Sequence, residues 1–143
     1  MNFEELTAPC GIDCFNCEVY ESNITPEVAA RLSAAFGFSP EKAACPGCRA
    51  SGGCRLHWGN CDTLDCVKSR GVSFCYECAD FPCPRLLPCA EAADRYPHNL
   101  KVFNLSRIRN VGIDVWARES MGNRALYFKG KFAVGKGPQK REP

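Results

Sequence analysis

Cysteine is the residue type in this chain with the most chemistry to offer, with twelve among 143 residues. Six of the cysteines form three Cys-x-x-Cys pairs: Cys14/Cys17, Cys45/Cys48 and Cys75/Cys78. Two intervening residues let both sulfur atoms of a pair face one point, and zinc prefers four soft ligands in a tetrahedron. One pair alone would be weak evidence. Three pairs with further cysteines nearby indicate structural zinc.

The remaining cysteines supply ligands that complete such sites. Cys61, Cys66 and Cys83 are natural partners for the pairs, and Cys10 precedes the first pair in C-G-I-D-C-F-N-C. Twelve thiolates divide into three sites of four, but two sites with spare thiols fit as well. The pairing, and the choice between two and three zinc ions, therefore stay open. The predicted metal ligands are Cys10, Cys14, Cys17, Cys45, Cys48, Cys61, Cys66, Cys75, Cys78 and Cys83, with Cys54 and Cys89 as further candidates.

An iron–sulfur cluster is the alternative cofactor, because thiolate sites accept iron or zinc according to geometry and supply. Cys10, Cys14 and Cys17 have the C-x3-C-x2-C spacing that radical-SAM enzymes use. Those enzymes need a large α/β barrel, which this chain is too short to form. An iron–sulfur protein for electron transfer or redox sensing remains as the alternative.

The sequence gives little support for an enzyme. Catalytic zinc keeps an open position and usually mixes histidine or carboxylate with its thiolates. The only histidines are His57 and His98, and their spacing is not that of a ligand pair. His57 is the one candidate to replace a cysteine, and His98 is expected at a helix start. No catalytic residue is predicted.

Length and composition indicate one domain, or one domain with a tail. No stretch approaches the roughly 18 consecutive apolar residues of a membrane helix, so we expect no membrane partner. Residues 1–6 lack the apolar core of a signal peptide. We therefore expect a cytoplasmic protein. Thiols stay reduced there, which favours metal ligation over disulfides.

The formal net charge is +2, but each tetrathiolate zinc centre would carry −2, so the net charge does not argue for nucleic acid. Residues 122–143 hold six Lys/Arg against Glu142 alone. In this tail, Tyr127, Phe128 and Phe132 are interleaved with the basic residues, which suits phosphate contact and base stacking. A solvated end of the chain explains the same pattern.

Helix signals occur on both sides of the cysteine-rich centre. Thr25 is a predicted N-cap before Pro26, and Gly37 is placed to stop that helix. Residues 45–83 show no sustained period and predict loops and short turns. Helices are further predicted for 84–96, with Pro88 inside, for 98–111, and for a short segment from Asp114 to near 122. Residues 125–134 are predicted as a hairpin or an extended arm.

The predicted fold is a small α-rich, metal-stapled domain. It has irregular cysteine-rich loops of the zinc-knuckle kind, about four short helices and little β-structure. We assign residues 1–121 to the cysteine-rich domain with its helical C-terminal part, and 122–143 to a basic tail. Trp116 and Phe103 are expected to pack between helices. The aromatic residues expected to cover the metal centres are Trp58, Phe74, Tyr76 and Phe81.

The order of the cysteines resembles that of domain-of-unknown-function family 3795. The shared pattern is C-G-x-x-C-x-x-C, then C-x-G-C, C-x4-C and G-V-x-x-C-x-x-C-x-x-[FY]-P-C. These segments are residues 10–17, 45–48, 61–66 and 71–83 here, and the likeness extends over about residues 8–118. The resemblance implies an uncharacterised bacterial or archaeal zinc-binding protein with no established activity. Cys54 and Cys89 lie outside the family's usual set, which makes them the expected free thiols.

Together these observations predict a cytoplasmic zinc-binding module with structural metal sites that acts through a protein partner. The alternatives are the iron–sulfur protein and a nucleic-acid-binding module that uses residues 122–143. We expect a non-enzymatic role.

Overall fold

The computed structural model of the protein describes residues 1–55 and 60–141. No described residue belongs to a β-strand, and isolated bridges are the only β-pairing in these ranges. No described helix is both long and apolar enough to cross a bilayer. The small α-rich fold is therefore confirmed, with five α-helices in these ranges instead of about four. They are α1 (Pro26–Phe36), α2 (Cys48–Ser51), α3 (Asp62–Arg70), α4 (Lys101–Val111) and α5 (Ile113–Lys129).

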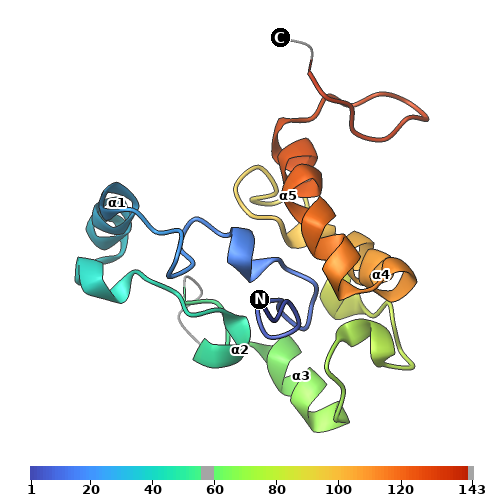
Figure 1. Ribbon diagram of the computed structural model, residues 1–143, viewed down its shortest axis with the longest axis horizontal. Coiled ribbons are helices and arrows are strands. Elements are labelled where there is room, and N and C mark those ends of the chain that lie inside the picture. The colour runs from blue at the N-terminus through green and yellow to red at the C-terminus, as the bar shows by residue number, and fades with distance from the viewer. Residues whose placement is uncertain (56–59, 142–143) are drawn as a thin grey trace.

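The helices form two groups with the N-terminal loops between them (Figure 1). Helices α1, α2 and α3 follow one another along one side, and α4 packs beside α5 on the other. The N-terminal segment contacts both groups. Arg49 of α2 donates to the carbonyl oxygens of Glu4 and Thr7, and Asn104 of α4 donates to that of Gly11. This arrangement brings cysteines from distant parts of the chain together.

Helix α1 begins and ends as the sequence predicts. The Thr25 side chain accepts a hydrogen bond from the backbone N–H of Val28, and Pro26 occupies the first turn. Leu32 is the buried residue of this helix. Gly37 ends the helix with φ +74°, a left-handed conformation in which a side chain would be strained.

Helix α3 was not predicted, because residues 45–83 were expected to form only loops and short turns. Asp62 and Asp65 lie in its first turn and Lys68 and Arg70 in its last, charges that favour the helix macrodipole. Leu64 and Val67, three residues apart, are buried. Gly71 then ends the helix at φ +64°. Short α2 is a second helix in the same predicted loop region.

The helix predicted for residues 84–96 is wrong. Only a 3₁₀ turn, Pro84–Leu86, forms at its start. Leu87 is already extended, as a residue before proline prefers, and Pro88 removes a backbone donor. The following turns include Ala92 at φ +55°, which no α-helix contains. Residues 98–111 are helical as predicted, through a 3₁₀ turn (His98–Leu100) and α4.

Helix α5 is much longer than the predicted short helix that ended near Gly122. It spans 17 residues, and its N-cap is Gly112, so Asp114 lies in the first turn and does not cap it. Glycine costs about 1 kcal/mol relative to alanine inside a helix. Two contacts made after Gly122 offset the cost of this glycine in the helix. Arg124 pairs with Asp13, and the Tyr127 hydroxyl donates a hydrogen bond to the Tyr96 carbonyl.

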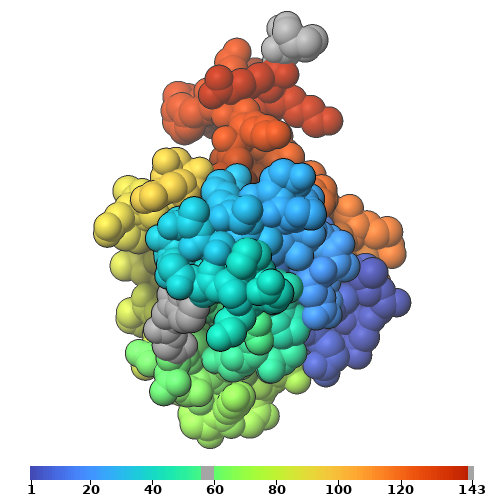
Figure 2. All heavy atoms as spheres, turned by 90° about the vertical axis from the view of Figure 1, so that its left-hand side faces the viewer, coloured from blue at the N-terminus to red at the C-terminus, as the bar shows by residue number. Residues whose placement is uncertain are grey.

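The hairpin predicted for 125–134 is therefore wrong in its first half, which is helical. After α5 the chain forms a loop closed by a single bridge between Lys131 and Gln139. This loop extends away from the body of the molecule (Figure 2). The expected boundary between residues 121 and 122 lies inside α5.

The interior consists of small apolar clusters in place of one large core. One joins α3 to α4 through Val67, Phe74, Leu86 and Leu105. Another surrounds Trp116, which is fully buried and meets Phe15 edge to face, with 6.0 Å between ring centroids. The helix-packing role predicted for Trp116 is confirmed. That for Phe103 is wrong, because its side chain is 51% exposed.

Candidate metal centre

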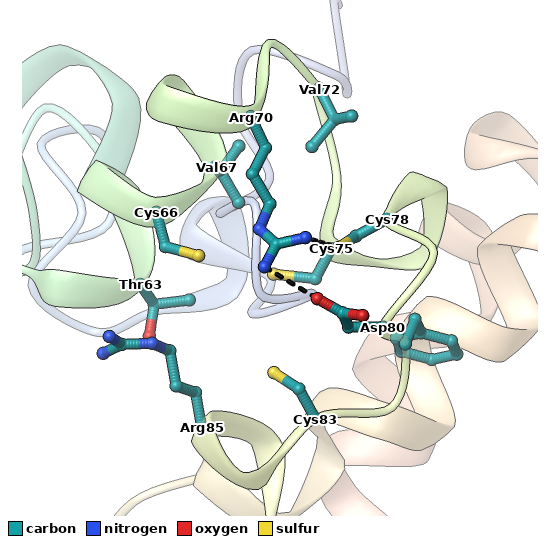
Figure 3. A pocket seen from close by; sticks show the side chains of 11 residues that line it. Thr63, Cys66, Val67, Arg70, Val72, Cys75, Cys78, Asp80, Cys83 and Arg85 are labelled. Atoms are coloured by element: carbon teal, nitrogen blue, oxygen red, sulfur yellow. Dashed lines mark hydrogen bonds and ion pairs between the residues drawn. The ribbon is translucent and has the colours of Figure 1, made fainter.

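Four cysteines line one small cavity beside α3 (Figure 3). The cavity has a volume of about 30 Å³. In Figure 3 the sulfur atoms of Cys66, Cys75 and Cys83 point into it from different sides. We call the four residues Cys66, Cys75, Cys78 and Cys83 the cavity thiols.

Three short elements position the cavity thiols. Cys66 lies in the middle of α3. Cys75 begins a 3₁₀ turn (Cys75–Glu77), and the N–H of Cys78 closes it on the Cys75 carbonyl at 3.2 Å. Cys83 is the N-cap of the 3₁₀ turn Pro84–Leu86. The pair Cys75/Cys78 thus presents two thiols from one turn, and α3 and the next turn supply one each.

Arg70, one turn after Cys66 on α3, reaches over the same cavity. Its Nη1 donates to the Cys78 sulfur at 3.1 Å, and its Nη2 lies 2.7 Å from Oδ2 of Asp80. The acidic partner Asp80, then Cys78, raise the pKa of Arg70 above its usual value. A second guanidinium, that of Arg85, also lines the cavity. Two cations therefore border a group of residues that would be anionic as thiolates.

The first two Cys-x-x-Cys turns, Cys14/Cys17 and Cys45/Cys48, contact each other. The N–H of Cys45 donates to the Val19 carbonyl at 2.8 Å, and the Cys45 carbonyl accepts from Glu21 at 3.0 Å. Beside them Gly47 is so close to the first turn that an added Cβ would lie 4.0 Å from Cβ of Cys14. These contacts bring the two turns against each other. We call the residues Cys14, Cys17, Cys45 and Cys48 the N-terminal thiols.

Burial strongly disfavours the charged form of several thiols. Burial, together with the neighbouring Cys10 and Cys45, raises the pKa of Cys14 to about 12. Burial, together with the neighbouring Cys10 and Cys83, likewise raises the pKa of Cys75 to about 12. Without a cation these thiols hold their protons at neutral pH. A bound metal ion reverses that preference, since it stabilises the thiolate directly.

The other cysteines have different surroundings. Cys10 packs against the clusters on both sides of the N-terminal segment, and burial raises its pKa. Cys61 packs in the same cluster as Cys48. Cys54 is half-buried, whereas Cys89 is exposed. All twelve cysteines lie in the described ranges, and no disulfide joins any of them.

In residues 1–55 and 60–141, no group of three or more cysteine, histidine or acidic side chains is placed so that it could hold a metal ion directly. The fit of a metal therefore depends on the donor set. Four thiols from three segments open on one cavity, and this is the ligand chemistry that zinc takes in structural sites. The donors present suit the ion, and side-chain rotations would have to bring them together.

The histidines and aromatic residues predicted near the metal centres differ in where they lie. His57 and Trp58 lie outside the described residues. His98 starts a 3₁₀ turn as predicted, and its Nε2 lies 2.8 Å from the Cys89 carbonyl oxygen. Tyr76 and Phe74 stack on each other, with 5.5 Å between centroids, and Phe81 lines the cavity.

Sequence reasoning missed Arg70 and Asp80 as neighbours of the cavity thiols. Arg70 ends a helix that was not predicted, and Asp80 lies between two cysteines of the C-Y-E-C-A-D-F-P-C segment. A signal was available in the pattern of α3. Cys66 and Arg70 are four residues apart, so a helix would place them on one face.

One family model matches the chain, over residues 6–88, and its description is "protein of unknown function (DUF3795)". No curated protein and no solved structure matches it. The match contains the cavity thiols and the N-terminal thiols. It ends before α4 and α5.

Proposed function

The chain belongs to DUF3795, a family of unknown function, and we propose that it is a zinc-binding protein in which the metal has a structural role. The observation that carries this proposal is the convergence of the four cavity thiols on one small cavity. A set of four thiolates leaves no position for water or substrate, as in structural zinc sites. The same site with iron is the alternative.

The cavity thiols would hold one ion and so connect three segments that are otherwise short turns and one helix. The apolar cluster beneath them, around Val67, Phe74 and Leu86, is small. Zinc would supply folding free energy there directly, on the order of 10 kcal/mol for a structural site. Arg70 and Arg85 would offset part of the negative charge that four thiolates leave on the ion.

The N-terminal thiols would hold a second ion in the same way. Their two turns are already in contact through Cys45 and Val19, so the ion would fix an arrangement that backbone hydrogen bonds begin. This gives two ions as the minimum. A third ion would require Cys10, Cys54 and Cys61 as ligands. The choice between two and three ions therefore stays open.

The partner that we propose for the folded module is another protein. Several large apolar side chains are exposed on the surface. Leu87 is 75% exposed, Met121 56% and Phe103 51%. Exposed apolar side chains are candidates for contact with other proteins when they lie near one another. A module stiffened by metal would present them on a fixed backbone.

Elemental analysis of protein purified without added metal tests the proposal. We expect at least two zinc ions per chain and no absorbance near 400 nm. The variant Cys83→Ser should lose one zinc ion, because three ligands remain at the cavity. Cys89→Ser is the matched control and should lose none, since Cys89 is exposed and away from the cavity. A brown protein containing iron would select the alternative, and metal-free protein with intact structure would exclude both.

A further inference from the structure

The end of the chain carries the most strongly basic surface of the described residues. Lys129, Lys131, Lys136, Lys140 and Arg141 are all exposed. No aspartate or glutamate occurs from residue 120 to residue 141. We call residues 129–141 the basic loop. Its charge attracts an anionic partner and is not neutralised by its own acidic residues.

The basic loop has a defined backbone. Lys131 and Gln139 exchange two backbone hydrogen bonds, at 2.8 and 2.9 Å. The N–H of Lys136 donates to the Ala133 carbonyl at 3.2 Å, and Gly135 and Gly137 turn the chain with positive φ angles. Figure 2 shows this part of the chain extending clear of the body. The loop is thus presented to solvent as a turn.

Two apolar side chains of the basic loop are almost entirely exposed to solvent. Phe132 is 84% exposed and Val134 is 86% exposed. Neither contributes to the apolar clusters of the interior. Apolar side chains among lysines match the interface of an anionic bilayer, where the apolar groups enter the headgroup region and the cations lie over the charges.

The nucleic-acid alternative for this tail relies on three stacking rings, Tyr127, Phe128 and Phe132. Tyr127 and Phe128 pack on each other at 4.9 Å with their planes near perpendicular. The Tyr127 hydroxyl donates to the Tyr96 carbonyl, and the Arg124 guanidinium covers the Phe128 ring at 5.8 Å. Phe132 is much more exposed than Phe128, at 84% against 36%. Val134 has no π-face, so base stacking gives it no role.

We propose that the basic loop docks the protein on anionic phospholipid surfaces, with Phe132 and Val134 entering the headgroup region. Such docking needs no spanning helix. It therefore replaces the expectation, based on the absence of a long apolar stretch, that the chain has no membrane partner. It is independent of the metal sites, which lie in other segments.

Cosedimentation with vesicles tests the proposal. We expect the full chain to bind vesicles of phosphatidylcholine and phosphatidylglycerol at low salt, and to bind phosphatidylcholine alone at least tenfold more weakly. The double variant Phe132→Ser, Val134→Ser should reduce partitioning on the order of tenfold. Lys131→Gln and Lys136→Gln should each reduce it about fivefold. Phe36→Ser is the matched control, because Phe36 is an exposed ring on α1, and it should leave partitioning unchanged.

Three results would overturn the proposal. One is no vesicle binding at low salt. Another is vesicle binding that the Phe132/Val134 variant leaves intact. The third is tighter binding to a single-stranded or duplex oligonucleotide than to anionic vesicles, which would restore the nucleic-acid reading. Zinc content and the far-UV circular dichroism of each variant are measured alongside. A failure of the metal proposal is thereby distinguished from a failure of this one.

Discussion

Arg124 of α5 and Asp13 of the first cysteine motif form an ion pair, with Nη1 and Oδ1 2.7 Å apart. The Asp13 side chain is 1% exposed and that of Arg124 16%. Asn16 reinforces the contact, since its amide donates to Asp13 and to the hydroxyl of Ser120, at 2.8 Å each. This network attaches the second half of α5 to the cysteine-rich segment, although the family match ends at residue 88.

Loss of one partner of this pair should destabilise the protein strongly. Arg124→Ala leaves the buried Asp13 carboxylate without its cationic partner, and we expect a loss of about 3 kcal/mol in the free energy of unfolding. Arg118→Ala, which removes an exposed arginine from the same helix, should cost less than about 0.5 kcal/mol. Chemical denaturation followed by circular dichroism measures both. Equal effects of the two variants would show that the pair is not important for stability.

Metal removal should unfold the cysteine-rich half before the helical half. The segments around the cavity thiols and the N-terminal thiols are short turns, whereas α4 and α5 pack on each other around Trp116. A strong chelator should therefore abolish most near-UV circular dichroism from Phe74 and Tyr76 and retain part of the helical signal. Added zinc should restore the spectrum. Metal-free protein with an unchanged near-UV spectrum would contradict a structural role for zinc.

The sequence predicts best those parts of the fold whose signals are local. Helix α1 has its cap, proline and stop within residues 25–37, and all three act as expected. Helix α3 lacks such a local signal. Its N-cap, Cys61, makes no side-chain cap hydrogen bond, and Cys66 in its middle was interpreted only as a metal ligand. The end of α5 was misplaced because Arg124 and Tyr127 find partners 111 and 31 residues away.

The candidate site likewise has parts that local sequence signals predict and parts that depend on long-range packing. The ligand type and the Cys-x-x-Cys turns can be recognised from spacing alone. The grouping of Cys66 with Cys75, Cys78 and Cys83 cannot, because it depends on how α3 packs against the following turns. Arg70 enters the site for the same reason. The four-residue spacing of Cys66 and Arg70 places both on one helix face, but it does not predict that the guanidinium reaches Cys78.

The stability contributed by Glu119 should depend on pH. Hydrogen bonds from Arg107 to both carboxylate oxygens, at 2.8 and 2.7 Å, lower the pKa of Glu119 below 4.5, its ordinary value. A lowered pKa in the folded state means that this stability is fully present above pH 4.5 and is lost as the pH falls through the folded-state pKa. Glu119→Gln should therefore have a flatter dependence of Tm on pH in that acidic window. The same slope in both proteins would refute this contribution.

Arg70 should slow the loss of zinc from the cavity thiols. Its guanidinium donates to the Cys78 sulfur at 3.1 Å and is held there by Asp80. On a metal-bound thiolate this hydrogen bond would stabilise the negative charge and make protonation or displacement of the ligand harder. Because the side chain is 47% exposed, water screens part of the effect. We expect Arg70→Gln to release zinc about fivefold faster to a chromogenic chelator.

Lys68→Gln is the control for this effect, because it removes a cation from the exposed face of the same helix without touching a thiol in the cavity. Its zinc release rate should match that of the unmodified protein. If Lys68→Gln and Arg70→Gln accelerated release equally, the effect would come from the general charge of α3. A specific role for Arg70 requires that only its removal shortens the lifetime of the zinc–thiolate centre, and that Asp80→Asn, which frees the guanidinium, shortens it to a smaller extent.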